Sequence, residues 1–179
     1  MKATGIVRRI DELGRIVVPK EIRRVLRIRE GDPLEIFTDK DGEIVLKKYS
    51  PIGELSAFAQ EYVDAIAASL GCGVCVCDRD QIIAVSGGPK KEYYQKTISR
   101  ALEHVIQERT VIQAGKEDRN FTPVTDDDGD SITAQVITPI ICEGDAIGAV
   151  IIMSREPRAK FSDPELRLAA TAAGFLGRQ

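Results

Sequence analysis

The chain of 179 residues contains no tryptophan, a single histidine and only 5% aromatic residues. The histidine, His104, falls within a predicted helix next to the inward-facing Val105, where a structural role is more common than catalysis. No Ser-His-Asp set, phosphate-binding loop or histidine-rich metal motif occurs in the sequence. We therefore expect no catalytic residues, no enzymatic activity and no cofactor.

Long hydrophobic runs are also absent. No apolar segment approaches the roughly 18 residues that a membrane-spanning helix needs, and the first residues lack the apolar core of a signal peptide. Hydrophobic residues make up 43% and charged residues 30% of the chain, which is typical of a folded protein and not of a disordered one. We expect a cytoplasmic protein that binds no membrane.

Cysteine is scarce, with four in the chain. Cys72 and Cys75 have the Cys-x-x-Cys spacing of some zinc and redox sites. In a predicted strand over residues 72–77, however, Cys75 and Cys77 point to one face and Cys72 to the other, so they do not converge on one metal. The acidic run 126–130 lacks the EF-hand spacing that calcium binding requires. We expect no metal site.

Charge is unevenly distributed along the chain. The formal net charge is −3, yet the segment through Arg29 holds nine basic and three acidic residues, a local charge of +6. The remainder therefore carries −9. A basic segment joined to an acidic remainder indicates a polyanionic partner such as nucleic acid. Because no aromatic residues alternate with the basic ones, duplex DNA fits better than a single strand.

Residues 14–24 read Gly-Arg-Ile-Val-Val-Pro-Lys-Glu-Ile-Arg-Arg. The β-branched residues 16–18 favour a strand, and Pro19 should end it, because proline cannot pair in a central ladder. The fixed φ of proline also suits the first turn of a helix that begins near Lys20. On that helix, Arg23 and Arg24 lie largely off the apolar stripe, facing water or a polyanion.

The first 50 residues contain the pattern of about four short strands and one helix. The strands are expected at 5–10, 15–18, 33–37 and 43–47, and the Asp41-Gly42 pair is a strong hairpin signal between the last two. A segment this small buries too little surface to be comfortably stable alone. Interleaving with a second copy would solve that problem.

Ser50-Pro51-Ile52-Gly53 marks a domain boundary, because proline and glycine stop the preceding strand. We divide the chain into a first domain over 1–50, a linker over 51–55 and a second domain over 56–179. Strands and helices mix in the second domain, which ends in a helix with the capping box Ser162-x-x-Glu165. Helices are expected at 54–70 and 91–109, and strands at 73–77, 81–86, 111–112, 132–141 and 146–153.

Residues 4–15, together with the 14–24 motif, closely resemble the DNA-binding domain of the AbrB/SpoVT family of bacterial transition-state regulators. The resemblance implies a swapped-hairpin β-barrel that forms only with a second chain. It places the family's DNA-contacting arginines at Arg8, Arg15, Arg23 and Arg24. Arg9, Lys20, Arg27 and Arg29 are secondary candidates, expected to contact phosphate at most.

The second domain resembles a GAF domain, on the segments 137–141 and 148–152 above all. The resemblance implies an α/β domain with an antiparallel sheet flanked by helices, so that the whole chain is α+β. GAF domains bind diverse small molecules or simply dimerise. The Asn-Lys-Phe-Asp-Glu set of some cyclic-nucleotide-binding members is not evident, and the residues identify no ligand.

We expect a homo-oligomeric, sequence-tolerant regulator that binds double-stranded DNA through its N-terminal domain. The C-terminal domains would pair through their first and last helices, giving a dimer of dimers. This domain order is that of the SpoVT-type family members, which implies both activation and repression of forespore sporulation genes. Two alternatives remain: an antitoxin-like protein that pairs with a toxin, and a sensor or scaffold whose N-terminal domain only dimerises.

Overall fold

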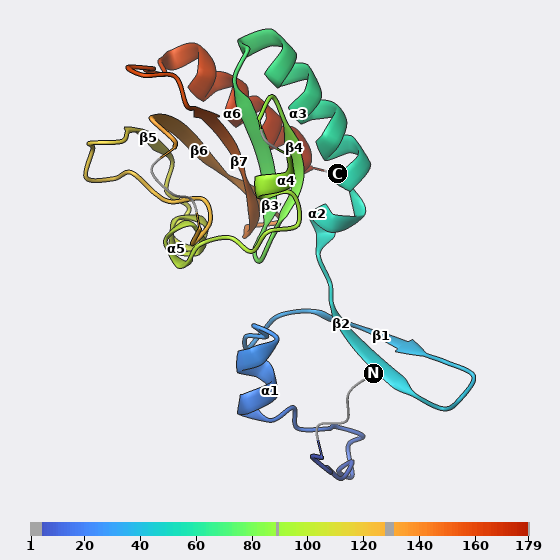
Figure 1. Ribbon diagram of the computed structural model, residues 1–179. Coiled ribbons are helices and arrows are strands. Elements are labelled where there is room, and N and C mark those ends of the chain that lie inside the picture. The colour runs from blue at the N-terminus through green and yellow to red at the C-terminus, as the bar shows by residue number, and fades with distance from the viewer. Residues whose placement is uncertain (1–4, 89, 128–130, 179) are drawn as a thin grey trace. The chain divides into compact units, whose positions relative to one another are not determined.

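The computed structural model describes residues 5–88, 90–127 and 131–178 (Figure 1). The chain divides into two compact units, Met1–Tyr49 and Ser50–Gln179. Each unit is described by itself below. The predicted chain break at 87–89 and the predicted acidic loop at 126–130 lie partly outside the described residues.

Over its described residues, 5–49, the N-terminal unit contains one helix and one hairpin. Helix α1 spans Lys20–Val25, and strands β1 (Leu34–Thr38) and β2 (Ile44–Lys48) pair antiparallel, with Ile36 opposite Leu46. Asp39 closes the hairpin turn, because its Oδ1 accepts the backbone N–H groups of Asp41 and Glu43, both at 3.0 Å. The hairpin predicted from the Asp-Gly pair is confirmed.

Residues 5–10 and 15–18, which the sequence predicts as strands, form no β-ladder with any described residue. The turn predicted between them does form, with Gly14 at a φ of +75° and its N–H donating to the carbonyl of Asp11. A strand exists only when its backbone groups have a partner strand. No described residue supplies such a partner for these two segments.

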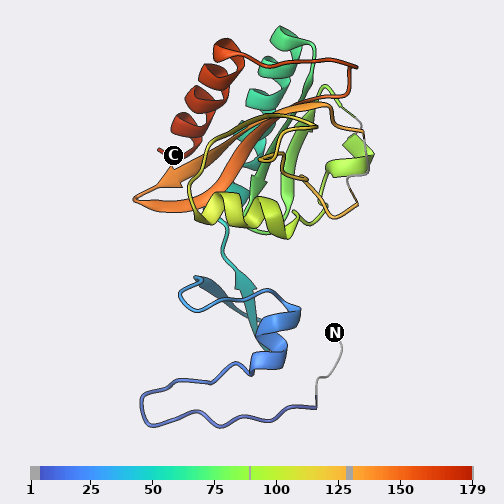
Figure 2. The same ribbon diagram turned by 90° about the vertical axis from the view of Figure 1, so that its left-hand side faces the viewer.

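The C-terminal unit is built on a five-stranded antiparallel sheet in the order β4-β3-β7-β6-β5. Figures 1 and 2 show α3 and α6 together on one face of this sheet and α5 on the other. The strands are β3 (Gly73–Asp78), β4 (Ile82–Ser86), β5 (Ile112–Gly115), β6 (Ala134–Cys142) and β7 (Asp145–Ser154). The helices are α2 (Pro51–Glu54), α3 (Ser56–Leu70), α4 (Lys90–Tyr93), α5 (Arg100–Gln107) and α6 (Asp163–Leu176).

Each face of the sheet has its own buried core. Val136, Val150 and Ile152 pack toward α3 and α6 with Val63 and Ala169. The alternate residues of the same strands, such as Cys75, Ile137 and Ile151, pack toward α5 with Leu102. This alternation follows from the two-residue period of a strand. It also confirms that Cys75 and Cys77 share a face, while Cys72 packs against the opposite core.

Two predicted helices are interrupted. The one predicted at 54–70 is divided at Leu55 between α2 and α3, and residues 51–54, predicted as linker, are helical with Ile52 fully buried. The one predicted at 91–109 is wrong as a single helix, because only α4 and α5 form there. Gln95 between them adopts a φ of +61°, which ends a right-handed helix. A new N-cap at Ser99, whose hydroxyl accepts from the N–H of Leu102, starts α5.

Candidate nucleic-acid interface

A tight turn in the N-terminal unit carries Arg15. The Oδ1 of Asp11 accepts the backbone N–H groups of Leu13 at 3.0 Å and Arg15 at 2.8 Å. The backbone N–H of Asp11 donates in turn to the carbonyl of Arg15 at 3.0 Å. Aspartate favours such turns because its short carboxylate reaches the backbone two to four residues ahead.

The same aspartate holds the Arg15 side chain. Nε of Arg15 donates to Oδ2 of Asp11 at 2.8 Å, while the arginine side chain stays 70% exposed. The Arg15 backbone N–H, and after it the guanidinium, lower the pKa of Asp11 below its usual range. Asp11 is therefore charged throughout the neutral range. The terminal nitrogens of Arg15 bond no described residue and remain available to a ligand.

Helix α1 carries the next two arginines. Pro19 lies at its N-cap, and the N–H of Arg23 donates to the carbonyl of Pro19 at 3.0 Å, which closes the first turn. Arg23 and Arg24 lie in the last turn, where positive charge suits the helix dipole. Arg24 is exposed, whereas Arg23 is half-buried and its Nε is enclosed without a partner among the described residues.

The remaining predicted contacts differ in exposure. Arg8, Arg9 and Lys20 are exposed, and Arg27 is half-buried with a φ of +52°. The carbonyl of Arg27 accepts from Nζ of Lys48 at 2.9 Å, which ties the end of α1 to β2. Arg27 is thus fixed through its backbone and is less able than Arg8 to reach a ligand.

Local ion pairs leave three of the four predicted DNA-contacting arginines without an acidic partner in the described chain. Only Arg15 of these four pairs with an acid of the described chain, and Arg8, Arg23 and Arg24 form no such ion pair. The acids nearest in sequence, Glu12 and Glu21, likewise pair with no described residue. An unpaired guanidinium keeps its full charge and its fork of donors for phosphate or a guanine edge. This part of the chain therefore has the chemistry of a polyanion-binding surface.

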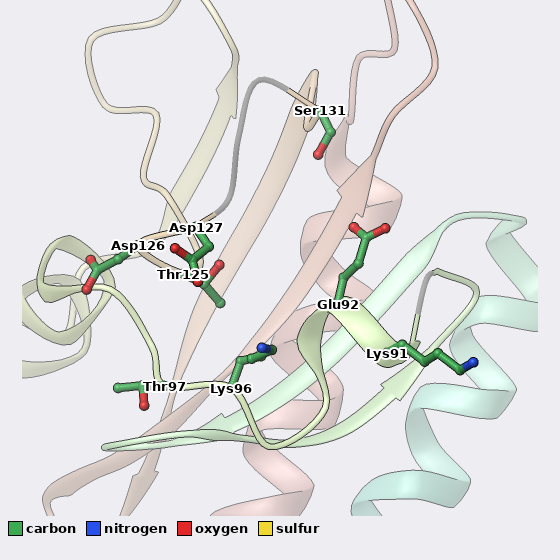
Figure 3. Close-up of a pocket in the computed structure, with 8 residues that line it drawn as sticks. All are labelled: Lys91, Glu92, Lys96, Thr97, Thr125, Asp126, Asp127 and Ser131. Carbon is green, nitrogen blue, oxygen red and sulfur yellow. The ribbon is translucent and has the colours of Figure 1, made fainter.

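The C-terminal unit has a cavity of about 580 Å³ that the sequence did not reveal. Figure 3 shows the lining side chains, which come from α4, from the segment after it, from residues 125–127 and from Ser131. Arg155 braces one wall, donating to Glu92 and, at 3.3 Å, to the hydroxyl of Tyr93. The lining combines two lysines, three carboxylates and three hydroxyls: Lys91, Glu92, Lys96, Thr97, Thr125, Asp126, Asp127 and Ser131. This mixture does not define a ligand class.

The other candidate reactive groups lie apart. His104 is exposed in the last turn of α5. Burial raises the pKa of Cys72 to about 11 and raises that of Cys77 as well, which leaves both thiols protonated and unreactive near neutral pH. Within 5–88, 90–127 and 131–178, no group of three or more His, Cys, Asp or Glu is placed to hold a metal ion. No helix of those residues is long and apolar enough to cross a membrane.

Comparison with known families agrees with the division into two units. Residues 54–179 match the family model described as stage V sporulation protein T C-terminal, transcription factor. Residues 7–54 match the model described as antidote-toxin recognition MazE, bacterial antitoxin. The antitoxin match covers the N-terminal segment alone, so the antitoxin-like alternative is not favoured for the whole chain.

Two relatives from Bacillus subtilis strain 168 align with the chain. Stage V sporulation protein T is 54% identical over 180 residues, which covers 100% of this chain and 98% of the relative. The transition state regulatory protein AbrB is 63% identical over 51 residues, which covers 28% of this chain and 52% of AbrB.

Solved structures confirm the fold of the C-terminal unit. The GAF domain from Acinetobacter phosphoenolpyruvate-protein phosphotransferase superposes with a TM-score of 0.56 at 12% identity, over 73% of this chain and 82% of that structure. A GAF domain region from Geobacter sulfurreducens gives 0.55 at 13% identity, over 71% and 93%. At such low identity the likeness concerns fold alone. The predicted α+β class, an AbrB-type domain followed by a GAF-like domain, is confirmed, and the chain belongs to the stage V sporulation protein T family of transcription factors.

Proposed function

We propose that this protein regulates sporulation genes by binding double-stranded DNA through its first domain, residues 1–50. The observation that carries the proposal is that Arg8, before the turn, and Arg23 and Arg24, on α1, pair with no acid of the described chain. The AbrB relative and the stage V sporulation protein T family model, both named for regulation, support the same role.

We assign the DNA contacts to Arg8, Arg15, Arg23 and Arg24. Guanidinium stays charged at every physiological pH and forms paired hydrogen bonds with phosphate or guanine. Arg9, Lys20 and Arg27 would add phosphate contacts, which fix position without reading sequence. Recognition dominated by charge and DNA shape would be tolerant of base sequence.

We further propose that the N-terminal units pair by exchanging hairpins. One face of the β1–β2 hairpin is apolar yet exposed in the single chain: Ile36 is 66%, Ile44 62% and Leu46 43% exposed. An apolar face of this kind is expected to pack against a second copy. The second domains, residues 56–179, would pair with one another through α3 and α6. The two kinds of pairing together would give a tetramer, a dimer of dimers.

The C-terminal unit would serve oligomerisation and, through its cavity, the sensing of a small molecule whose identity the lining leaves open. The protein would have no enzymatic activity, would act in the cytoplasm, and would both activate and repress its targets. A scaffold whose N-terminal unit only dimerises is the competing function. It predicts no affinity for DNA.

The test is fluorescence anisotropy of a labelled promoter duplex titrated with the full chain. Arg15→Ala with Arg23→Ala should weaken binding at least about thirty-fold, since each lost contact is worth roughly 1–3 kcal/mol. The matched control is Arg100→Ala with Arg119→Ala, which removes the same charge from exposed positions of the C-terminal unit. Control and unmodified protein should bind alike; equal affinity in all three proteins would refute the proposed DNA contacts.

A further inference from the structure

Asp11 is an acidic residue in the middle of the surface assigned to DNA. A carboxylate there repels phosphate, so simple charge counting predicts that removing it strengthens binding. Its contacts point the other way. Three hydrogen bonds converge on its two oxygens, from the N–H of Leu13, the N–H of Arg15 and the Nε of Arg15.

Those contacts hold the Arg15 side chain at two points, at its backbone and at its guanidinium group. The bond to the Arg15 N–H sets the backbone at the base of the side chain, and the bond to Nε sets the plane of the guanidinium at its tip. The terminal nitrogens bond no described residue and so remain available to a ligand. A long, 70% exposed arginine would otherwise sample many rotamers, and ordering it on binding would reduce affinity.

Glu12, the next residue, provides an internal comparison. It is exposed, carries the same charge in the same turn, and bonds no described residue. Repulsion of phosphate by either carboxylate is weak, because water and salt screen it, and amounts to a factor below about two. The loss of a charge-assisted bond that preorganises Arg15 is larger, on the order of three- to ten-fold in affinity.

We propose that Asp11 is a positioning residue for DNA recognition: it closes the turn and holds the Arg15 guanidinium with its terminal nitrogens toward the DNA. This inference rests on the proposed function, because it acts through the contact assigned to Arg15. It predicts that loss of a negative charge weakens binding to a polyanion. The depressed pKa of Asp11 agrees with a carboxylate that is charged in the functional state.

The test is a double-mutant cycle in the full chain, read by anisotropy on one duplex at fixed salt. Asp11→Asn should weaken binding about three- to ten-fold, and Glu12→Gln should leave it unchanged or strengthen it by less than about two-fold. In an Arg15→Ala background, Asp11→Asn should have no further weakening effect. A residue that merely stabilises the fold would weaken binding equally in both backgrounds.

The outcomes separate the two proposals. If Arg15→Ala weakens binding but Asp11→Asn behaves like Glu12→Gln, the positioning role is overturned and the DNA contact stands. Equal weakening by Asp11→Asn with and without Arg15 also overturns it. If Arg15→Ala itself has no effect, the contact assigned to Arg15 fails, and the positioning role fails with it. Proton exchange of the Arg15 Nε–H, measured by NMR without DNA, should be slow in the unmodified protein and in Glu12→Gln, and fast in Asp11→Asn.

Discussion

The two units of the chain bury their apolar residues very differently. Every buried hydrophobic residue of the described chain lies between Ile52 and Leu176, in the C-terminal unit. In the N-terminal unit, only Pro19 of residues 5–49 is buried. Most of the exposed large hydrophobic residues lie there, among them Val7 at 86%, Val17 at 73% and Val25 at 76%. Both units contain apolar residues, but only the C-terminal unit encloses them in a core.

The C-terminal sheet has helices on both faces, and each face closes a core. Within the described residues of the N-terminal unit no second layer covers the β1–β2 hairpin, although its strands also carry β-branched and apolar residues. Because an exposed apolar face of this size is unfavourable in water, we propose that a second copy of the chain supplies the missing layer. The comparison therefore predicts a stable C-terminal unit and an N-terminal unit that depends on its partner.

The largest expected effect comes from Gly148→Ala in β7. The added Cβ would fall on the carbonyl oxygen of Cys77 in the neighbouring strand β3, and backbone in the centre of a sheet cannot move aside. We expect the C-terminal unit to lose more than about 4 kcal/mol of unfolding free energy. The measurement is urea unfolding followed by circular dichroism.

Gly174→Ala is the matched control for that substitution. It adds the same methyl group on α6, where no atom lies within 4 Å of the new Cβ. Alanine is favoured over glycine in a helix interior, so this variant should be more stable by about 0.5–1 kcal/mol. Destabilisation of both variants by similar amounts would contradict the account of a closed, tightly packed sheet.

A second, smaller effect is expected from Ile36→Asp on the exposed face of β1. A substitution at a position 66% exposed should change stability by less than about 0.5 kcal/mol if the single chain is the functional unit. If a second copy covers this face, the charge would be buried and the dimer should lose about 3 kcal/mol. Sedimentation equilibrium of the full chain distinguishes these results.

Val111→Asp serves as the control for Ile36→Asp. Val111 is 51% exposed in the C-terminal unit, just before β5. Its replacement should leave both association and stability nearly unchanged. Dissociation in Ile36→Asp alone would support the difference between the units, and unchanged association in both variants would remove the argument for a second copy at this hairpin.

The smallest effect is expected at the start of α6. Ser162→Ala removes one side of the capping box, and we expect a loss of about 1 kcal/mol of unfolding free energy. The Ser162 backbone N–H, at 2.7 Å from the Glu165 carboxylate, lowers the pKa of that carboxylate. Its contribution to stability is therefore present above the ordinary pKa of 4.5 and is lost as the pH falls through the lower, folded-state value.

Thermal unfolding at pH 7 and at pH 3 measures both parts of this prediction. Glu165→Gln should lower stability at pH 7 and lower it less at pH 3, because the stabilising effect of the Glu165 charge diminishes as the pH falls below 4.5. An equal loss at both pH values would mean that the charge of Glu165 does not stabilise the cap.

Local sequence signals predicted the elements that depend on near neighbours. The Asp41-Gly42 turn, the capping box at Ser162 and the helix after Pro19 all formed where the residues indicated. Each rests on hydrogen bonds within a few positions along the chain. These interactions are present in the sequence pattern itself.

Elements that depend on distant contacts were not predictable in this way. The break between α4 and α5 is stabilised by bridges from Gln81 to Thr97 and from Ile98 to Thr125, which helical periodicity does not reveal. The cavity likewise gathers residues from separate loops. In the N-terminal unit, the DNA-contacting arginines were predicted from their sequence motif. The hydrogen bonds between Asp11 and Arg15 were not predicted, because they depend on the geometry of the turn.

The dependence of DNA affinity on salt tests the central claim most directly, namely that the N-terminal unit binds DNA through arginine–phosphate contacts. We would measure the affinity of the full chain for a duplex from about 50 to 300 mM salt, beside the Arg15/Arg23 double alanine variant. Each phosphate contact contributes about −0.9 to the slope of log affinity against log salt. We predict a slope of about −4 or steeper, reduced in the variant by at least about 1.8. A slope near zero, or the same slope in both proteins, would contradict the account.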